Sequence, residues 1–132
     1  MSRVHVSTED LPYRVSLRSE QHQWLADEPL ELGGGDTGPT PTQLLLSSLG
    51  ACTAITLKMY ATRKQWPLTR VDIDLTLNPD GKPASGTAIR RTLHLEGELD
   101  ESQRARLLQI ANACPVHKLL AGEVHLESLL DQ

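Results

Sequence analysis

The stretch that decides the fold covers residues 40–64 and reads TPTQLLLSSLGACTAITLKMYATRK. Thr40 is followed by a proline and, three residues later, by Gln43, which together form a capping box with proline at the favoured first helical position. We therefore expect a helix from Pro41 to about Lys64. Apolar residues lie on nearly all sides of this helix, and most of its polar interruptions are small. A helix of this kind is buried on most sides, and in so short a chain a partner subunit can supply part of the cover.

Alternating apolar and polar residues predict strands before and after this helix. Upstream, residues 13–18 alternate as on a half-buried sheet face, and a second short strand is expected from His22 to Ala26. The glycine-rich residues 33–39 are interpreted as a flexible connection. Downstream, residues 71–77 and about 88–98 alternate, and the turn signal between them predicts an antiparallel hairpin.

The last third of the chain combines a helix with the second cysteine. Asp100 opens a helix through a second capping signal, and the helix ends near Ala113 because Pro115 disfavours helical geometry in the residue before it. Cys114 then becomes the N-cap of a short helix, and a last strand is expected over residues 123–128. The predicted fold class is α+β, a mostly antiparallel sheet on two helices, in one domain over residues 1–132.

Composition narrows the classes of partner. The chain of 132 residues has a formal net charge of -4, and no basic stretch interleaves with aromatic residues, which argues against nucleic acid. The longest uninterrupted apolar run, residues 44–46, is too short to span a bilayer, and the N-terminus has no signal-peptide core. We therefore expect a cytoplasmic protein without a membrane partner. Few aromatics and no Phe leave a thin core, which favours a dimer.

The only two cysteines, Cys52 and Cys114, lie in different settings. Structural disulfides are rare in the cytoplasm, so both thiols are either inert core residues or redox-active. Cys52 lies roughly 18 Å from its helix N-terminus, beyond the reach of the helix dipole. By its own position it is a small core residue unless a cation acts on it. Cys114 stands at a helix start, where backbone N–H groups stabilise a thiolate, although a simple capping role is the alternative. His117 can also face it.

Two other kinds of site have less support. The spacing from Cys114 to His117 is typical of half a zinc site, but Cys52 has no histidine or cysteine nearby and structural zinc needs four ligands. Residues 33–39 lack both the Gly-Lys-Ser/Thr ending and the GxGxxG spacing of phosphate-binding loops. We therefore expect no metal and no resident cofactor.

Two motifs resemble those of a known family. Residues 38–52, GPTPTQLLLSSLGAC, resemble the first-cysteine helix of the OsmC/Ohr family, and residues 114–118, CPVHK, resemble its second-cysteine motif. The family comprises osmotically inducible protein C and the organic hydroperoxide resistance proteins. The resemblance covers essentially the whole chain and is closest to the general OsmC-like branch. It implies an intertwined homodimer, with two long central helices wrapped by two sheets and active sites at the subunit interface.

The resemblance also implies an activity, the thiol-dependent reduction of organic hydroperoxides. On this reading Cys52 is the peroxidatic thiolate that becomes a sulfenic acid, Cys114 is the resolving thiol that closes a disulfide, and an external dithiol restores both. An arginine on an early strand activates the first cysteine, with Arg18 as the leading candidate and Arg14 as the other. The residues expected at the substrate are Thr42, Gln43 and His117.

The chain departs from the peroxidase pattern near the start of the long helix. Thr42 stands ten residues before the first cysteine, where the family's catalytic glutamate lies, and Gln43 stands where the broader family often has a glutamate. Neither can hold an arginine by an ion pair, and Glu28 or Glu31 could replace the missing carboxylate. Two alternatives therefore stay open: a redox-sensing or small-ligand-binding protein with weak or no peroxidase activity, and a structural dimer with inert thiols.

Overall fold

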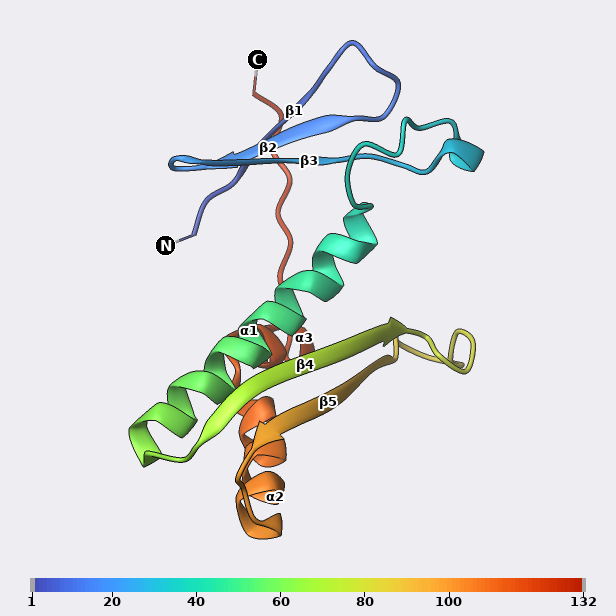
Figure 1. Cartoon of the computed structure of the whole chain (residues 1–132). Helices are drawn as coiled ribbons and strands as arrows, with labels where there is room; N and C mark the ends of the chain where they lie inside the picture. Colours follow the sequence, from blue (N-terminus) through green and yellow to red (C-terminus); the bar gives the residue numbers. More distant parts are fainter. Residues whose placement is uncertain (1, 132) are drawn as a thin grey trace. The chain divides into compact units, whose positions relative to one another are not determined.

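The computed structural model describes residues 2–131, which form two compact units that meet in sequence between Leu45 and Leu46 (Figure 1). The described chain has the predicted α+β class, but its strands form two antiparallel sheets in place of the one expected, together with three α-helices. Its elements, in order, are β1 (His5–Thr8), β2 (Val15–Ser19), β3 (His22–Ala26), the 3-10 helix η1 (Leu30–Leu32), α1 (Pro41–Lys64), β4 (Leu68–Leu77), β5 (Ile89–Gly97), α2 (Glu101–Ile110), the 3-10 helix η2 (Ala111–Ala113) and α3 (Pro115–Ala121).

The first unit contains a three-stranded antiparallel sheet in the order β1-β2-β3. The glycine-rich connection that follows it is ordered around Asp27, whose side chain is only 3% exposed. One carboxylate oxygen accepts hydrogen bonds from the backbone N–H groups of Gly35 and Thr37 and from the Thr37 hydroxyl, at 3.2, 3.2 and 2.7 Å. Residues 33–39 thus fold around a buried acceptor. The sequence predicted a flexible connection from their glycine content, but hydrogen bonds to Asp27 fix their backbone.

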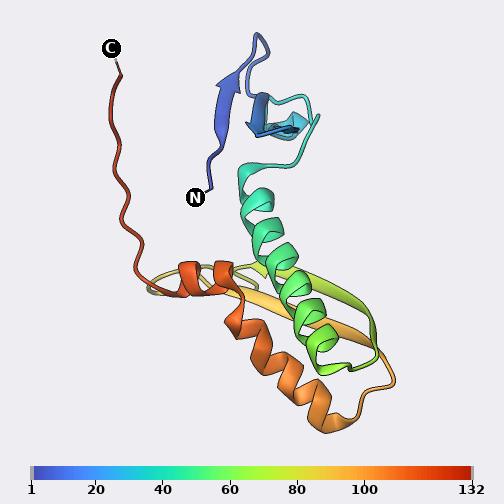
Figure 2. The same cartoon turned by 90° about the vertical axis from the view of Figure 1, so that its left-hand side faces the viewer.

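The second unit packs two helices on the β4–β5 hairpin (Figure 2). Residues of β5 alternate strictly between half-buried and exposed positions, because successive side chains of a strand point to opposite faces. The inward positions of both strands meet the buried faces of α1 and α2. The core of this unit consists of Leu57, Ala61, Leu68, Leu107 and Ala111.

The predicted helix starts are confirmed. The Thr40 N–H donates to Gln43 Oε1 at 2.9 Å, and the Gln43 N–H donates to Thr40 Oγ1 at 3.2 Å. Asp100 and Gln103 form the same reciprocal pair before α2. Each pair satisfies backbone donors that the first helical turn leaves without an intrahelical partner, which is why these short motifs fix the boundaries so well.

The predicted last strand is wrong. Residues 123–131 carry no strand pairing in the structure and leave α3 as an extended segment (Figure 2). A strand needs a neighbouring edge for its backbone groups, and this segment pairs with none in the described chain. Its apolar side chains are consequently bare, with Leu126 91% exposed and Leu129 and Leu130 each 87% exposed.

The long helix α1 buries only one side. An 18-residue window of α1 has a mean hydropathy of 1.4, so by length and composition alone the helix could cross a membrane. Only 22% of that window is buried. Core helices of other proteins pass the same test, and α1 places Leu57 and Ala61 in the core. Its opposite side leaves Ile55 and Met59 exposed by 55% and 62%. The described residues of the second unit therefore leave this side of α1 without the cover that the sequence pattern anticipates.

Replacing Leu107 by alanine should destabilise the second unit by about 2–5 kcal/mol, because this side chain is fully buried and its truncation leaves a cavity. The matched control is Leu108→Ala on the same helix, where the side chain is 60% exposed and the expected cost is about 0.5 kcal/mol or less. Urea unfolding followed by circular dichroism measures both. Equal losses in the two variants would show that the core lies elsewhere.

Candidate thiol site

Cys114 caps a helix with its side chain. It is the N-cap of α3, in extended geometry and followed by Pro115 at the first helical position, as the sequence predicts. Its Sγ accepts the backbone N–H of His117 at 3.2 Å. The side chain is 0% exposed, so this sulfur is held inside the second unit.

Cys52 contacts the same first turn of α3. It lies on α1, is half-buried, and its Sγ accepts the backbone N–H of Val116 at 3.5 Å. Its thiol also hydrogen-bonds to Cys114. Two successive N–H groups of α3, those of Val116 and His117, therefore bind the two sulfurs, and both cysteines are free. The fold brings together two residues that the sequence could link only through a family resemblance.

A buried hydroxyl lies beside the second sulfur. Thr53 follows Cys52 on α1 and is 0% exposed. Its Oγ1 is 2.7 Å from the Leu49 carbonyl oxygen and 3.8 Å from Cys114 Sγ, so its single proton has two acceptors. Arg91 donates to the same Oγ1 from Nη1 at 3.0 Å. The hydroxyl thus connects a guanidinium on β5 to the thiol on the cap of α3.

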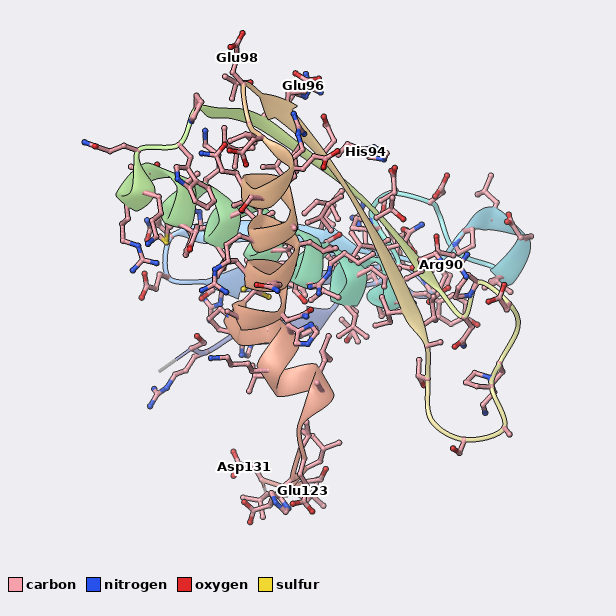
Figure 3. The ribbon with its side chains drawn as sticks, turned by 90° about the horizontal axis from the view of Figure 1, so that it is seen from below. Arg90, His94, Glu96, Glu98, Glu123 and Asp131 are labelled. Atoms are coloured by element: carbon pink, nitrogen blue, oxygen red, sulfur yellow. The ribbon has the colours of Figure 1, made fainter. Side chains whose placement is uncertain are left out.

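Arg91 joins three further elements at this point. Its Nη2 donates to Asn112 Oδ1 at 3.1 Å and to His117 Nδ1 at 3.1 Å. Because a guanidinium can only donate, His117 Nδ1 accepts and the ring proton lies on Nε2. Arg91 takes an inward position of β5, whereas Arg90, His94 and Glu96 are spaced along its exposed face (Figure 3).

The charge of Arg91 has no carboxylate partner among residues 2–131. The ion pairs of this part of the chain are Arg14–Glu9, Arg70–Asp72, Arg90–Asp80, His94–Asp74 and His125–Glu123. All three hydrogen-bond acceptors of Arg91 are neutral. A half-buried cation with neutral partners favours a nearby anion, and the Cys114 thiol, whose pKa the charge of Arg91 lowers, is a group able to become one.

The thiol of Cys114 is biased toward its charged form. Burial raises the pKa of Cys114, but hydrogen bonds from the His117 N–H, Cys52 and Thr53, together with the charge of Arg91, outweigh burial and hold that pKa below its ordinary value. The prediction that this position stabilises a thiolate agrees with the structure. The sequence identified only the helix start as its cause.

The other residues predicted for the site belong to the first unit. Arg18 lies on β2 opposite His5 and Gln23. Arg14 is held by Glu9, with Nη2 2.7 Å from Oε1. Their roles toward the first cysteine, and those of Thr42 and Gln43 as substrate contacts, stay predictions. Thr42 is exposed on the first turn of α1, and Gln43 serves the capping box. His117, the remaining predicted contact, reaches the site through its backbone N–H and through Arg91.

Three residues of the site escaped the sequence interpretation: Arg91, Thr53 and Asn112. A signal for Arg91 exists, because it precedes Leu93 and Leu95 on the apolar face of a strand, where an arginine is out of place. Thr53 gives a weaker signal, since α1 contains several small polar residues. Asn112 gives none, because it lies at the irregular end of α2.

Two hollows flank the site without containing either sulfur. One, of about 400 Å³, is lined by Arg91, Asn112 and His117 among apolar side chains that include Leu49 and Leu93. The other, of about 750 Å³, lies between α1 and β4. Within residues 2–131, no group of three or more His, Cys, Asp or Glu side chains is placed to hold a metal ion.

Comparison with known proteins gives the chain a family. A sequence model of the family described as OsmC-like protein matches residues 33–128, which include both cysteines. A search of curated protein sequences finds no significant match.

Solved structures share the fold at low sequence identity. The OsmC-like protein from Mycoplasma pneumoniae superposes with a TM-score of 0.78 at 20% identity, covering 92% of this chain and 88% of that one. An organic hydroperoxide resistance protein OsmC from Legionella pneumophila gives 0.66 at 19% identity, with coverage of 92% and 90%. The organic hydroperoxide resistance protein OhrB of Bacillus subtilis gives 0.61 at 22% identity, with coverage of 92% and 91%. At such identities the likeness shows a shared fold.

Native alkylation should label Cys52 before Cys114, because Cys52 is half-buried whereas Cys114 has no exposed surface. The measurement is limited iodoacetamide treatment of the reduced protein, followed by mass spectrometry of peptides. Denatured protein is the control, in which both thiols should react at similar rates. Earlier labelling of Cys114 in the native protein would contradict the described burial.

Proposed function

Because the chain belongs to the OsmC-like protein family, we propose that it is a thiol-dependent peroxidase that reduces organic hydroperoxides with Cys52 and Cys114. The observation that carries this proposal is the pair of free sulfurs bound by successive N–H groups of α3. The names of the Legionella and Bacillus proteins, both called organic hydroperoxide resistance proteins, support the choice of substrate class.

The different exposure of the two sulfurs supports the proposed division of roles. A hydroperoxide has to reach the sulfur that attacks it, and Cys52 is the half-buried thiol whereas Cys114 is fully buried. Cys52 is therefore the peroxidatic residue and Cys114 the resolving residue. The hydrogen bond between them gives the attacking sulfur a route to lose its proton, because the Cys114 thiolate can accept it.

The reaction has three balanced steps. The Cys52 thiolate attacks the terminal oxygen of the hydroperoxide, the O–O bond breaks, and a sulfenic acid forms on the sulfur. The alkoxide takes the proton that Cys114 received from Cys52 and leaves as the alcohol, which returns Cys114 to its thiolate form. The Cys114 thiolate then attacks that sulfur, a disulfide forms, and hydroxide leaves and is protonated to water. An external dithiol reduces the disulfide by exchange and becomes a disulfide itself. The cytoplasm, where we propose the protein acts, supplies such reductants.

Ionisation alone does not make a fast enzyme. A thiol with an ordinary pKa near 8.5 is roughly a tenth ionised at pH 7.5, so full ionisation gains only about tenfold. Orientation of the peroxide and stabilisation of the leaving oxygen have to supply the rest. Arg18 is the residue we propose for this role.

A redox sensor with weak turnover is the second candidate. Thr42 offers no carboxylate to orient an arginine, and the Gln43 side-chain oxygen accepts the Thr40 N–H in the capping box. A protein that keeps the sulfur pair without this orienting ion pair would form the disulfide but turn over slowly. The two candidates differ in turnover and share the first oxidation.

Cys52→Ser should reduce consumption of cumene hydroperoxide to the background rate, because the attacking sulfur is lost. Cys114→Ser should keep one oxidation per chain but accumulate a product heavier by one oxygen atom, because nothing closes the disulfide. The turnover assay measures hydroperoxide loss with excess dithiothreitol, and the intact mass is measured separately, on reduced protein freed of dithiothreitol and treated with one equivalent of hydroperoxide. Wild-type consumption no faster than that of Cys52→Ser would sink the peroxidase. Disulfide formation without sustained turnover would select the sensor.

We also propose that two copies of the chain form a homodimer through the surfaces it leaves bare. The apolar side of α1 with Ile55 and Met59 and the extended C-terminal segment with Leu126 are both exposed. Exposed apolar area of this kind on an ordered helix marks an interaction surface. A second copy offers the same two surfaces, and a partner strand edge would supply the pairing that residues 123–128 lack.

In solution the protein should have about twice the chain mass of 14.5 kDa. Ile55→Asp should shift it toward the monomer, because a carboxylate would be buried in the apolar contact. Thr92→Asp, on the exposed face of β5, is the matched control and should leave the mass unchanged. Light scattering after gel filtration measures both. A monomeric wild type, or a dimer insensitive to Ile55→Asp, would refute the proposed interface.

A further inference from the structure

We infer that Arg91 is a positioning residue for the resolving step, acting through the Thr53 hydroxyl to hold Cys114 as a thiolate beside Cys52. The catalytic consequence, faster closure of the disulfide, rests on the proposed function. The stabilisation of the Cys114 thiolate by Arg91 does not depend on any reaction with peroxide. Nη1 of Arg91 lies 3.0 Å from Thr53 Oγ1, which lies 3.8 Å from Cys114 Sγ.

Charge balance gives the first reason. Arg91 is half-buried on the inward face of β5, and its three acceptors, on Thr53, Asn112 and His117, carry no charge. A cation in that setting loses hydration without gaining a carboxylate. A thiolate on Cys114 restores the balance, and Arg91 contributes to the lowered pKa of that thiol.

The groups that face Cys114 come from three elements. On α1 they are the Cys52 thiol and the Thr53 hydroxyl, on β5 the Arg91 guanidinium, and on α3 the His117 backbone N–H. The His117 ring is turned to Arg91, with its Nδ1 as acceptor. Arg91 is the one permanent charge in this set. Its own charge lowers the pKa of Cys114 less than each of the three hydrogen bonds does, but Arg91 also holds the Thr53 hydroxyl, so its removal should weaken two of these contributions together.

The Thr53 hydroxyl can change its acceptor with the charge state of Cys114. When Cys114 is neutral, the Thr53 hydroxyl donates its hydrogen bond to the closer acceptor, the Leu49 carbonyl oxygen at 2.7 Å. When Cys114 is anionic, the sulfur becomes the stronger acceptor, and the same proton can turn to it while Arg91 continues to donate to Oγ1. Thr53 therefore links the Arg91 guanidinium to the Cys114 sulfur through two consecutive hydrogen bonds, and valine at that position could form neither.

The consequence is faster closure of the disulfide. The Cys114 thiolate attacks the Cys52 sulfenic acid, the S–S bond forms, the S–O bond breaks, and hydroxide leaves and becomes water. Raising the pKa of Cys114 by one unit would cut the thiolate fraction up to about tenfold, while the higher nucleophilicity of the more basic thiolate recovers about half of that factor in logarithmic terms. The net slowing expected at neutral pH is therefore about threefold.

The test is a thiolate titration of the full chain in a Cys52→Ser background, where Cys114 is the sole thiol and serine keeps a donor at position 52. Absorbance at about 240 nm reports the thiolate, and a variant lacking both cysteines supplies the tyrosine baseline. Arg91→Met should move the midpoint upward by about one pH unit, and Thr53→Val should move it in the same direction. Arg91→Lys should restore most of the difference. The matched control is Arg90→Met, which removes an arginine from the exposed face of the same strand.

An unchanged midpoint in both Arg91→Met and Thr53→Val, or an equal shift in Arg90→Met, would overturn the inference. If Arg91→Met does not fold, the midpoints of Arg91→Lys and Thr53→Val decide. A second readout, in protein with both cysteines, is the Cys52 sulfenic acid trapped by dimedone, which should persist about threefold longer in Arg91→Met. A shifted titration without any sulfenic acid would refute the peroxidase while leaving the role of Arg91 intact.

Discussion

The first turn of α3 holds both sulfurs, and the arrangement of the second unit follows from that constraint. Pro115 starts the helix immediately after Cys114, so the N–H groups of Val116 and His117 have no intrahelical acceptor and donate to the two sulfurs instead. For this to happen α3 has to lie against α1 at Cys52, which requires a close approach. Thr53, next to Cys52 on α1, is small and fully buried, so it allows this close approach, and its hydroxyl contacts the Cys114 sulfur.

Burial and charge oppose each other at this point, and the outcome gives the two thiols different chemistry. A buried sulfur disfavours ionisation, yet Cys114 collects enough donors and a guanidinium to reverse the balance. Cys52 keeps access to small molecules but sits beside a charged neighbour. A pair built this way combines a protected anion with an approachable thiol, which suits the proposed resolving step, in which the Cys114 thiolate attacks the oxidised Cys52.

Local signals in the sequence were sufficient for the helices and for the setting of Cys114. The capping boxes at Thr40 and Asp100 and the Cys114-Pro115 junction involve neighbours in the chain, so reading them needs no tertiary information. Arg91 could not be placed in this way, because its partners lie on α1, η2 and α3 and its role exists only once they meet. The predicted strand over residues 123–128 failed for a related reason, since alternation marks a segment able to pair but does not supply the edge it pairs with.

The proposed function depends on the two sulfurs reacting with each other within one chain. The most direct measurement is the intact and peptide mass of the reduced protein after one equivalent of cumene hydroperoxide. We expect the loss of two hydrogen atoms and a peptide in which Cys52 is joined to Cys114. A stable oxygen adduct on Cys52 with Cys114 still free, or a disulfide joining two chains, would contradict it.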